Sequence, residues 1–76
     1  MLTADKIPIN VPHNVIDISP CYIKSRLIEM GISTGITIVK LFVSPGGDPI
    51  AFSINGDYVL SLRISEADNI IVEEKL

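Results

Sequence analysis

"IAFSINGDYVLSL", residues 50–62, is typical of a β-hairpin, and its apolar pattern restricts how the two strands can pair. A two-residue loop at the Asn-Gly pair would place Phe52 opposite Val59. A three-residue loop from Asn55 to Asp57 would instead place Phe52 opposite Leu60, so that apolar side chains meet on one face. A slip of one residue moves every side chain to the other face. The alternation therefore predicts the longer loop, although an Asn-Gly pair by itself favours the shorter one.

The segments on either side of this hairpin predict further short strands. Alternating residues predict a first strand over residues 14–19, and a β-branched run predicts a long, bent strand over 36–43. After the hairpin, residues 65–68 predict one helical turn capped by its serine, and residues 70–74 predict a last strand. Residues 1–13 contain two prolines and are expected to be irregular.

One helix is predicted over residues 20–30, between the first strand and the bent strand. Ser19 is a natural N-cap before Pro20, and Gly31 is a natural residue to end the helix. One helix face gathers apolar side chains, those of Ile23, Leu27 and Met30. Cys21 and Ile28 are expected on nearly the opposite face, pointing away from the rest of the protein.

These elements predict a mainly β protein, a small SH3-like barrel of five strands. One α-helix follows the first strand, and a short helical turn precedes the last strand. The length of 76 residues is that of a single domain. We expect this domain to span residues 14–76, after an irregular N-terminal segment of residues 1–13.

Charge and hydropathy restrict the classes of partner. The net charge is −3, and the six basic residues are scattered along the chain, so nucleic acid and anionic membranes are unfavourable partners. The longest stretches without a charged residue have ten residues, too few to span a membrane. A start that carries Asp5 is unlike a signal peptide, and a single cysteine forms no internal disulfide. These features predict a cytoplasmic protein, for which a homo-oligomer is possible.

Residues for catalysis or for tight metal binding are scarce. The chain has one histidine, His13, and one cysteine, Cys21, and we predict neither an enzyme nor a cofactor. A structural zinc site would need four nitrogen or sulfur ligands, so we expect no tight binding of Fe(II). Two interpretations remain for four acidic side chains, a weak site for a hard cation or a solvated rim. These side chains are Glu66, Asp68, Glu73 and Glu74.

The glycine-rich stretch "SPGGDPIAF", residues 44–52, is a bend between strands rather than a phosphate-binding loop. It lacks the Gly-Lys-Ser/Thr ending of a P-loop and does not lead into a helix. Its Asp48 is expected to accept hydrogen bonds from amides of the bend. Proline-rich peptides bind in grooves lined by aromatic side chains. This chain has only four aromatic residues, and Phe52 is expected to point inward, so recognition of such peptides is disfavoured.

The ordered pieces "RLIEMGISTG", "GDPIAF" and "NGDYVLSLRISEADNIIVE", which lie within residues 23–74, resemble the FeoA family, ferrous iron transport protein A. This resemblance implies a small cytosolic SH3-like protein that accompanies the ferrous iron permease FeoB. It implies an accessory or regulator rather than an enzyme. The same domain occurs at the C-terminus of iron-dependent repressors of the DtxR type. The stretch before the helix here is shorter than is usual in the family, and it lacks glycine.

The leading hypothesis is therefore a non-enzymatic module that docks on a FeoB-type permease. The alternative is a metal-sensing domain that binds Fe(II) directly. The candidate partner-binding residues are Cys21, Tyr22, Arg26 and Ile28. Two explanations remain for the apolar Ile28 and Cys21. Either the N-terminal stretch around Ile7 and Val11 folds over them, or they form an exposed patch of the kind that marks protein contacts.

Overall fold

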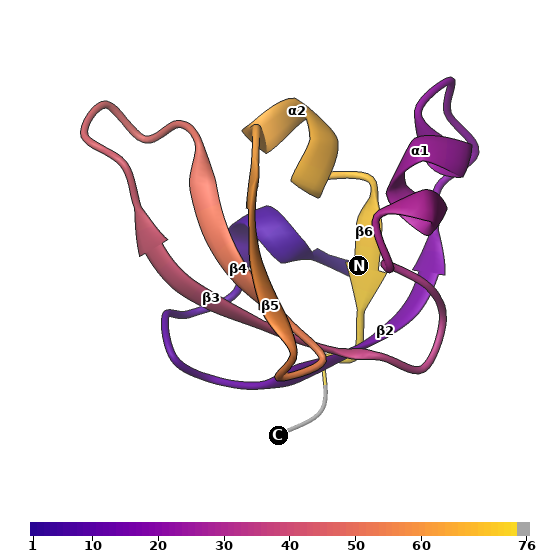
Figure 1. Ribbon diagram of the computed structural model, residues 1–76, viewed down its shortest axis with the longest axis horizontal. Helices are drawn as coiled ribbons and strands as arrows, with labels where there is room; N and C mark the ends of the chain where they lie inside the picture. Colours follow the sequence, from indigo (N-terminus) through magenta and orange to yellow (C-terminus); the bar gives the residue numbers. More distant parts are fainter. Residues whose placement is uncertain (75–76) are drawn as a thin grey trace.

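The computed structural model describes residues 1–74, which form a strongly curved antiparallel sheet of six strands (Figure 1). The strands follow the order β1-β6-β2-β3-β4-β5 across the sheet. Within residues 1–74 no pairing joins β5 to β1, so the barrel is open between these two end strands. The elements are β1 Leu2–Thr3, the 3-10 helix η1 Ala4–Lys6, β2 His13–Ile18, α1 Lys24–Glu29, β3 Thr37–Val43, β4 Ile50–Ile54, β5 Tyr58–Leu62, α2 Ile64–Ala67 and β6 Ile70–Val72.

The hairpin of β4 and β5 has the register that its alternation predicts. Phe52 pairs with Leu60, and Ile54 pairs with Tyr58 across a loop of three residues. The Phe52 side chain is fully buried, whereas Val59 is 58% exposed on the outer face. The backbone of Asn55 has a positive φ of 54°, and the following glycine also has one, which suits a tight loop.

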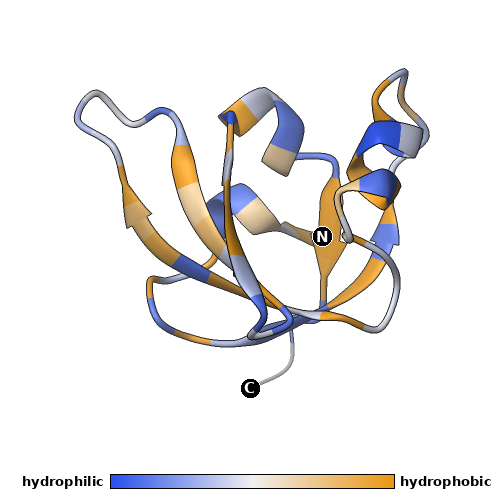
Figure 2. Ribbon diagram, in the orientation of Figure 1, coloured by the Kyte–Doolittle hydropathy of each residue, from blue (hydrophilic) through white to orange (hydrophobic). Residues whose placement is uncertain are grey.

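The strand β3 is long, bent and shared, as its apolar composition predicts. It pairs with β2 through Thr37 and Ile38 and with β4 along most of its length. A register shift between Lys40 and Phe42 bends it. The inward side of this curved sheet holds the core, and apolar residues recur along its strands in Figure 2.

The prediction of five strands and an irregular N-terminal segment is wrong for residues 2–6. Leu2 and Thr3 form β1, which pairs with β6, and the next three residues form η1. Ile7 follows this turn and is buried in the core. The sequence pattern could not show this because a strand of two residues has no periodicity, and only its partner β6 makes it a strand.

The helix α1 is shorter than predicted at its N-terminal end. Residues 20–23 form a turn instead, in which the Lys24 amide bonds the Cys21 carbonyl oxygen at 3.2 Å. Ser19 does not cap the helix, and its own amide donates to the Asn69 carbonyl oxygen at 2.8 Å. The C-terminal end follows the prediction. Gly31 has a φ of 94°, and the Ile32 amide bonds the Leu27 carbonyl oxygen at 3.0 Å, as in a Schellman motif.

The short helix α2 begins one residue earlier than predicted, and its N-terminus is satisfied by two carboxylates. The Glu66 carboxylate accepts a hydrogen bond from the Arg63 amide at 2.7 Å. The Asp48 carboxylate accepts one from the Ile64 amide at 2.9 Å. Asp48 therefore contacts α2, in contrast to the expectation that it would bond amides of its own bend. Residues 44–49 do form a bend between β3 and β4, as predicted.

Candidate functional site

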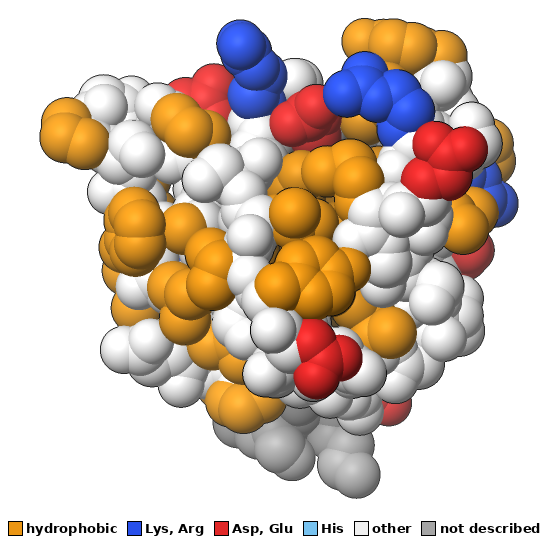
Figure 3. All heavy atoms as spheres, in the orientation of Figure 1, with side chains coloured by type: hydrophobic (Ala, Val, Ile, Leu, Met, Phe, Trp, Pro, Cys, Tyr) orange, Lys and Arg blue, Asp and Glu red, His pale blue; other side chains and the backbone are white. Residues whose placement is uncertain are grey.

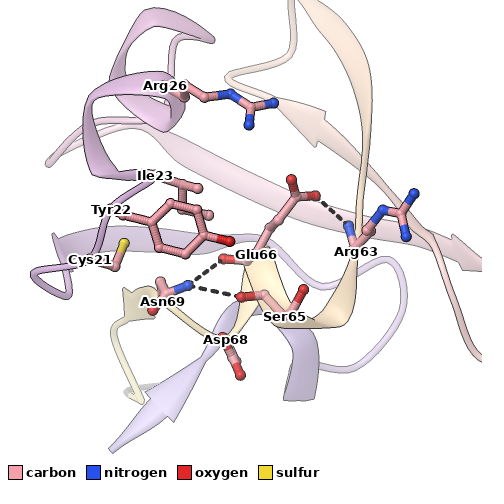
Figure 4. A pocket seen from close by; sticks show the side chains of 9 residues that line it. All are labelled: Cys21, Tyr22, Ile23, Arg26, Arg63, Ser65, Glu66, Asp68 and Asn69. Carbon is pink, nitrogen blue, oxygen red and sulfur yellow. Dashed lines mark hydrogen bonds between the residues drawn. The ribbon is translucent and has the colours of Figure 1, made fainter.

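A cleft of about 470 Å³ lies between the turn that precedes α1 and the helix α2 (Figure 4). One wall comes from residues 21–26, and the other comes from the end of β5, from α2 and from the residues just after it. The lining residues are Cys21, Tyr22, Ile23, Arg26, Arg63, Ser65, Glu66, Asp68 and Asn69.

The α2 wall of this cleft is braced by hydrogen bonds. The Asn69 side-chain amide donates to the Ser65 carbonyl oxygen at 2.9 Å. The Glu66 carboxylate bonds the Arg63 amide, as described above. Because the Asn69 carbonyl oxygen also accepts from the Ser19 amide, the two walls are connected at their base. The cleft is thus built between two segments that are distant in the sequence, residues 21–26 and 63–69.

The other wall exposes an aromatic ring and a guanidinium over an apolar floor. Tyr22 is 96% exposed, and Arg26 is also exposed. Ile23 is buried in the core below them, and Cys21 is half-buried against that core. The floor is therefore apolar and the rim polar, which is the usual composition of a protein-binding surface.

Three of the four predicted partner-binding residues line this cleft, and Ile28 does not. Ile28 lies on the other side of α1, where it lines a separate shallow groove of about 310 Å³ with Ile18 and Thr34 among its neighbours. It stays 48% exposed. The N-terminal turn η1 packs against α2, β3 and β6, and Ile7 is buried in the core, so this segment does not cover Ile28.

The helical projection predicted that Cys21 points away from the protein, and this prediction is wrong. Cys21 packs partly against the core because it lies in the turn before α1, where helical periodicity does not apply. As predicted, Ile23 and Leu27 are buried and Met30 packs against the core.

The sequence alone did not predict that the α2 wall belongs to a binding site. The sequence pattern offered one signal for it, an arginine directly after a hairpin strand, but only folding brings Arg63 opposite Arg26 (Figure 4). Glu66 and Asp68 were grouped with two later acidic residues instead. In the structure, Glu66 and Asp68 precede β6, whereas Glu73 and Glu74 follow it. Glu73 accepts a hydrogen bond from the Asn14 side chain at 3.1 Å, and Glu74 pairs with the chain's amino terminus at 3.6 Å.

The other candidate ligands lie at opposite ends of β2, His13 at its start and Cys21 beyond the end of that strand, where it lines the cleft with Glu66 and Asp68. His13 is buried at the start of β2, where its Nδ1 lies 3.0 Å from the Val11 carbonyl oxygen. Residues 1–74 contain no group of three His, Cys, Asp or Glu side chains placed to hold a metal ion. Over the same residues, no helix has the length and apolar character needed to cross a membrane.

Comparison with known proteins identifies the family. The model of the FeoA domain matches residues 13–74. This chain belongs to the FeoA family. The resemblance noted from the sequence is thereby confirmed. The matched range begins with the first residue of β2, so β1 and η1 precede it.

Solved structures of other FeoA proteins share this fold. The FeoA-like protein from Clostridium acetobutylicum is 38% identical, with a TM-score of 0.88, over 99% of this chain and 87% of that chain. Iron(II) transport protein A from Clostridium thermocellum is 32% identical, with a TM-score of 0.87, over 95% of this chain but 44% of that chain. The match therefore spans less than half the length of that chain.

The FeoA from Stenotrophomonas maltophilia, a procaryotic SH3 domain protein solved as a complex with zinc, is 26% identical. Its TM-score is 0.83 over 96% of this chain and 91% of that chain. The predicted mainly β, SH3-like fold is thus confirmed, with six strands in place of five. Among curated proteins, no match was found.

Proposed function

We propose that this FeoA domain docks on a FeoB-type ferrous iron permease, at its cytoplasmic side, through the cleft between α1 and α2. The observation that carries the proposal is the nearly complete exposure of Tyr22 beside Arg26 on the wall of that cleft. Tyrosine and arginine are enriched among the residues that dominate binding energy at interfaces. A tyrosine ring that contributes little to the core is available for a partner.

The rest of the cleft suits a small, reversible interface. Ile23 and Cys21 give an apolar floor, and the charged side chains of Arg26, Arg63 and Glu66 stand at the rim. An apolar centre within a polar rim excludes water from the contacts that bind most strongly.

Direct sensing of Fe(II) was the alternative function. Cys21, Glu66 and Asp68 line one cleft, but residues 1–74 contain no group of three His, Cys, Asp or Glu side chains placed to hold a metal ion. No contact among residues 1–74 favours direct Fe(II) sensing over docking, so docking on the permease is the function that we propose.

The test compares two exposed aromatic side chains. Tyr22→Ala should weaken binding to the detergent-solubilised permease by about tenfold or more, the usual effect of removing a dominant interface residue. The matched control is Phe42→Ala, since Phe42 is exposed near the end of β3, on the side of the sheet far from α1 (Figure 1). Both variants should keep the wild-type melting temperature. Equal affinities for the two variants, or no binding by the wild type, would contradict the proposed function.

A further inference from the structure

Three charged side chains form a row across the rim of the cleft. Arg26 stands on α1, Arg63 stands at the end of β5, and the Glu66 carboxylate lies between them in Figure 4. In the space-filling view, basic and acidic side chains alternate along this edge of the molecule (Figure 3). The row separates the apolar floor of the cleft from the solvent above α2.

The two guanidinium groups of this row stand apart from the ion pairs of the described residues. Neither Arg26 nor Arg63 forms an ion pair with a carboxylate of residues 1–74. Two other basic side chains of the same range are engaged, since Lys6 pairs with Asp5 at 3.4 Å and Lys40 is buried against the Asp5 carbonyl oxygen. Lys24 lines the separate groove that holds Ile28. The cleft therefore presents two guanidinium groups that carboxylates of the described residues leave free to pair with a partner.

The acidic residues of the cleft form no ion pair with these two arginines. The Glu66 carboxylate accepts the hydrogen bond of the Arg63 amide, which holds it at the start of α2. The Asp68 side chain extends away from the row, toward the opposite side of α2 (Figure 4). An arginine guanidinium forms its strongest contacts with a carboxylate that it can grip with two parallel hydrogen bonds.

We propose that the segment of the partner that enters this cleft is an acidic peptide stretch, with carboxylates that pair with Arg26 and Arg63. This inference rests on the proposed function and specifies the chemistry of the partner at the same site. The rest of the domain has an acidic excess, since the whole chain carries a net charge of −3. An acidic segment is thus repelled elsewhere and attracted at this rim, which fixes its position and orientation.

The first experiment measures affinity for the detergent-solubilised permease. Arg26→Gln and Arg63→Gln should each weaken binding about threefold, and the double variant about tenfold, because exposed charge pairs contribute modestly. Glu66→Gln should strengthen binding about twofold, since the amide oxygen still accepts from the Arg63 amide while the repelling charge is removed. Wild-type affinity should fall as salt is raised, and the double variant should lose most of this dependence.

The second experiment identifies the contacting group. Arg26→Lys and Arg63→Lys keep the positive charge and supply a primary amine, which a carbodiimide joins to a carboxylate in direct contact. Each variant should form a cross-link to the permease that the wild type does not form. Lys24, on the same helix but outside the cleft, serves as a control, because its amine should not form this cross-link. Mass spectrometry of the cross-linked product should locate the linkage at an aspartate or glutamate within an acidic stretch.

The outcomes separate this inference from the proposed function. If Tyr22→Ala weakens binding but the double Gln variant and salt do not, the cleft docks a partner that is not acidic, and the inference is overturned alone. If neither lysine variant forms a new cross-link while both bind normally, the inference is likewise overturned. If the wild type does not bind the permease, the proposed function fails and the inference falls with it.

Discussion

The ammonium group of Lys40 donates a hydrogen bond to the backbone carbonyl oxygen of Asp5 at 2.7 Å, and so connects β3 to the first turn of the chain. Lys40 is 8% exposed, and it lies in the interior because it pairs with the buried Phe52 across the β3–β4 ladder. The Asp5 carboxylate is held nearby through the Thr3 hydroxyl at 2.6 Å. A charged residue in the middle of an apolar strand thus anchors the N-terminal turn.

Lys40→Ala should therefore destabilise the protein by about 2–4 kcal/mol, because it removes a packed aliphatic stem and leaves the Asp5 carbonyl oxygen without its donor. The measurement is urea denaturation, and hydrogen exchange of residues 2–7 should speed up more than that of β4. The control is Lys6→Ala, which removes an exposed lysine paired with the same aspartate and should cost less than about 1 kcal/mol. Equal costs for the two variants would show that the buried contact contributes nothing.

Phe52 is the largest fully buried side chain, and Phe52→Ala should cost about 3–5 kcal/mol in unfolding free energy. Val59 serves as the matched control, because it lies on the neighbouring strand and points outward. Val59→Ala should change the unfolding free energy by less than about 0.5 kcal/mol. Thermal or chemical denaturation of both variants checks the register, since a hairpin slipped by one residue would reverse the two results.

Gly31 is required for two reasons that can be separated. Its φ of 94° is unfavourable for a residue with a side chain, and an added Cβ would overlap the hydroxyl of Tyr58, which donates to the Met30 carbonyl oxygen. Gly35 has a similar φ of 97° with nothing near an added Cβ. Gly35→Ala should cost about 1–2 kcal/mol from conformation alone, and Gly31→Ala should cost more.

The cost of Gly31→Ala should shrink in the background of Tyr58→Phe, which removes the overlapping hydroxyl. Melting temperatures of the four proteins in this double-mutant cycle measure the coupling. If Gly31→Ala costs no more than Gly35→Ala, then Tyr58 does not occupy the space that the structure assigns to it.

Asp48 is the carboxylate that satisfies the amide of Ile64 at the start of α2. Asp48→Ala should destabilise the protein by about 0.5–2 kcal/mol, as the loss of a helix cap does. Asp48→Asn keeps an oxygen that can accept the same hydrogen bond and should retain most of the stability. Denaturation of the two variants at the same pH makes the comparison, and an Asn variant as unstable as the Ala variant would rule out capping by a neutral oxygen.

Ile28 lines an open groove apart from the proposed docking cleft, so its replacement tests two ideas at once. Ile28→Asp should leave the melting temperature nearly unchanged, because the side chain is half exposed and an aspartate there stays hydrated. It should also leave binding to the permease unchanged. Loss of binding by a well-folded variant would move the docking surface from the α1–α2 cleft to the other side of the helix.

The candidate site could be predicted only in part. Tyr22 and Arg26 were predicted as partner-binding residues from the sequence, and both line the cleft. The opposite wall could not be predicted, because Arg63 and Glu66 approach α1 only after the hairpin is folded. Ile28 was grouped with the wrong neighbours for a related reason. The helical projection was extended over residues 20–23, which form a turn.

Local pattern alone determined the β4–β5 register, the bend before β4 and the Gly31 helix end. In each case the interacting residues are close in sequence, so that side-chain alternation, glycine and loop length restrict the backbone directly. The tertiary structure decided the pairing of β1 with β6, the burial of Lys40 on Asp5 and the capping of α2 by Asp48. These contacts join groups far apart in the chain, and they form because buried polar groups and unpaired strand edges need partners that only the folded chain brings near.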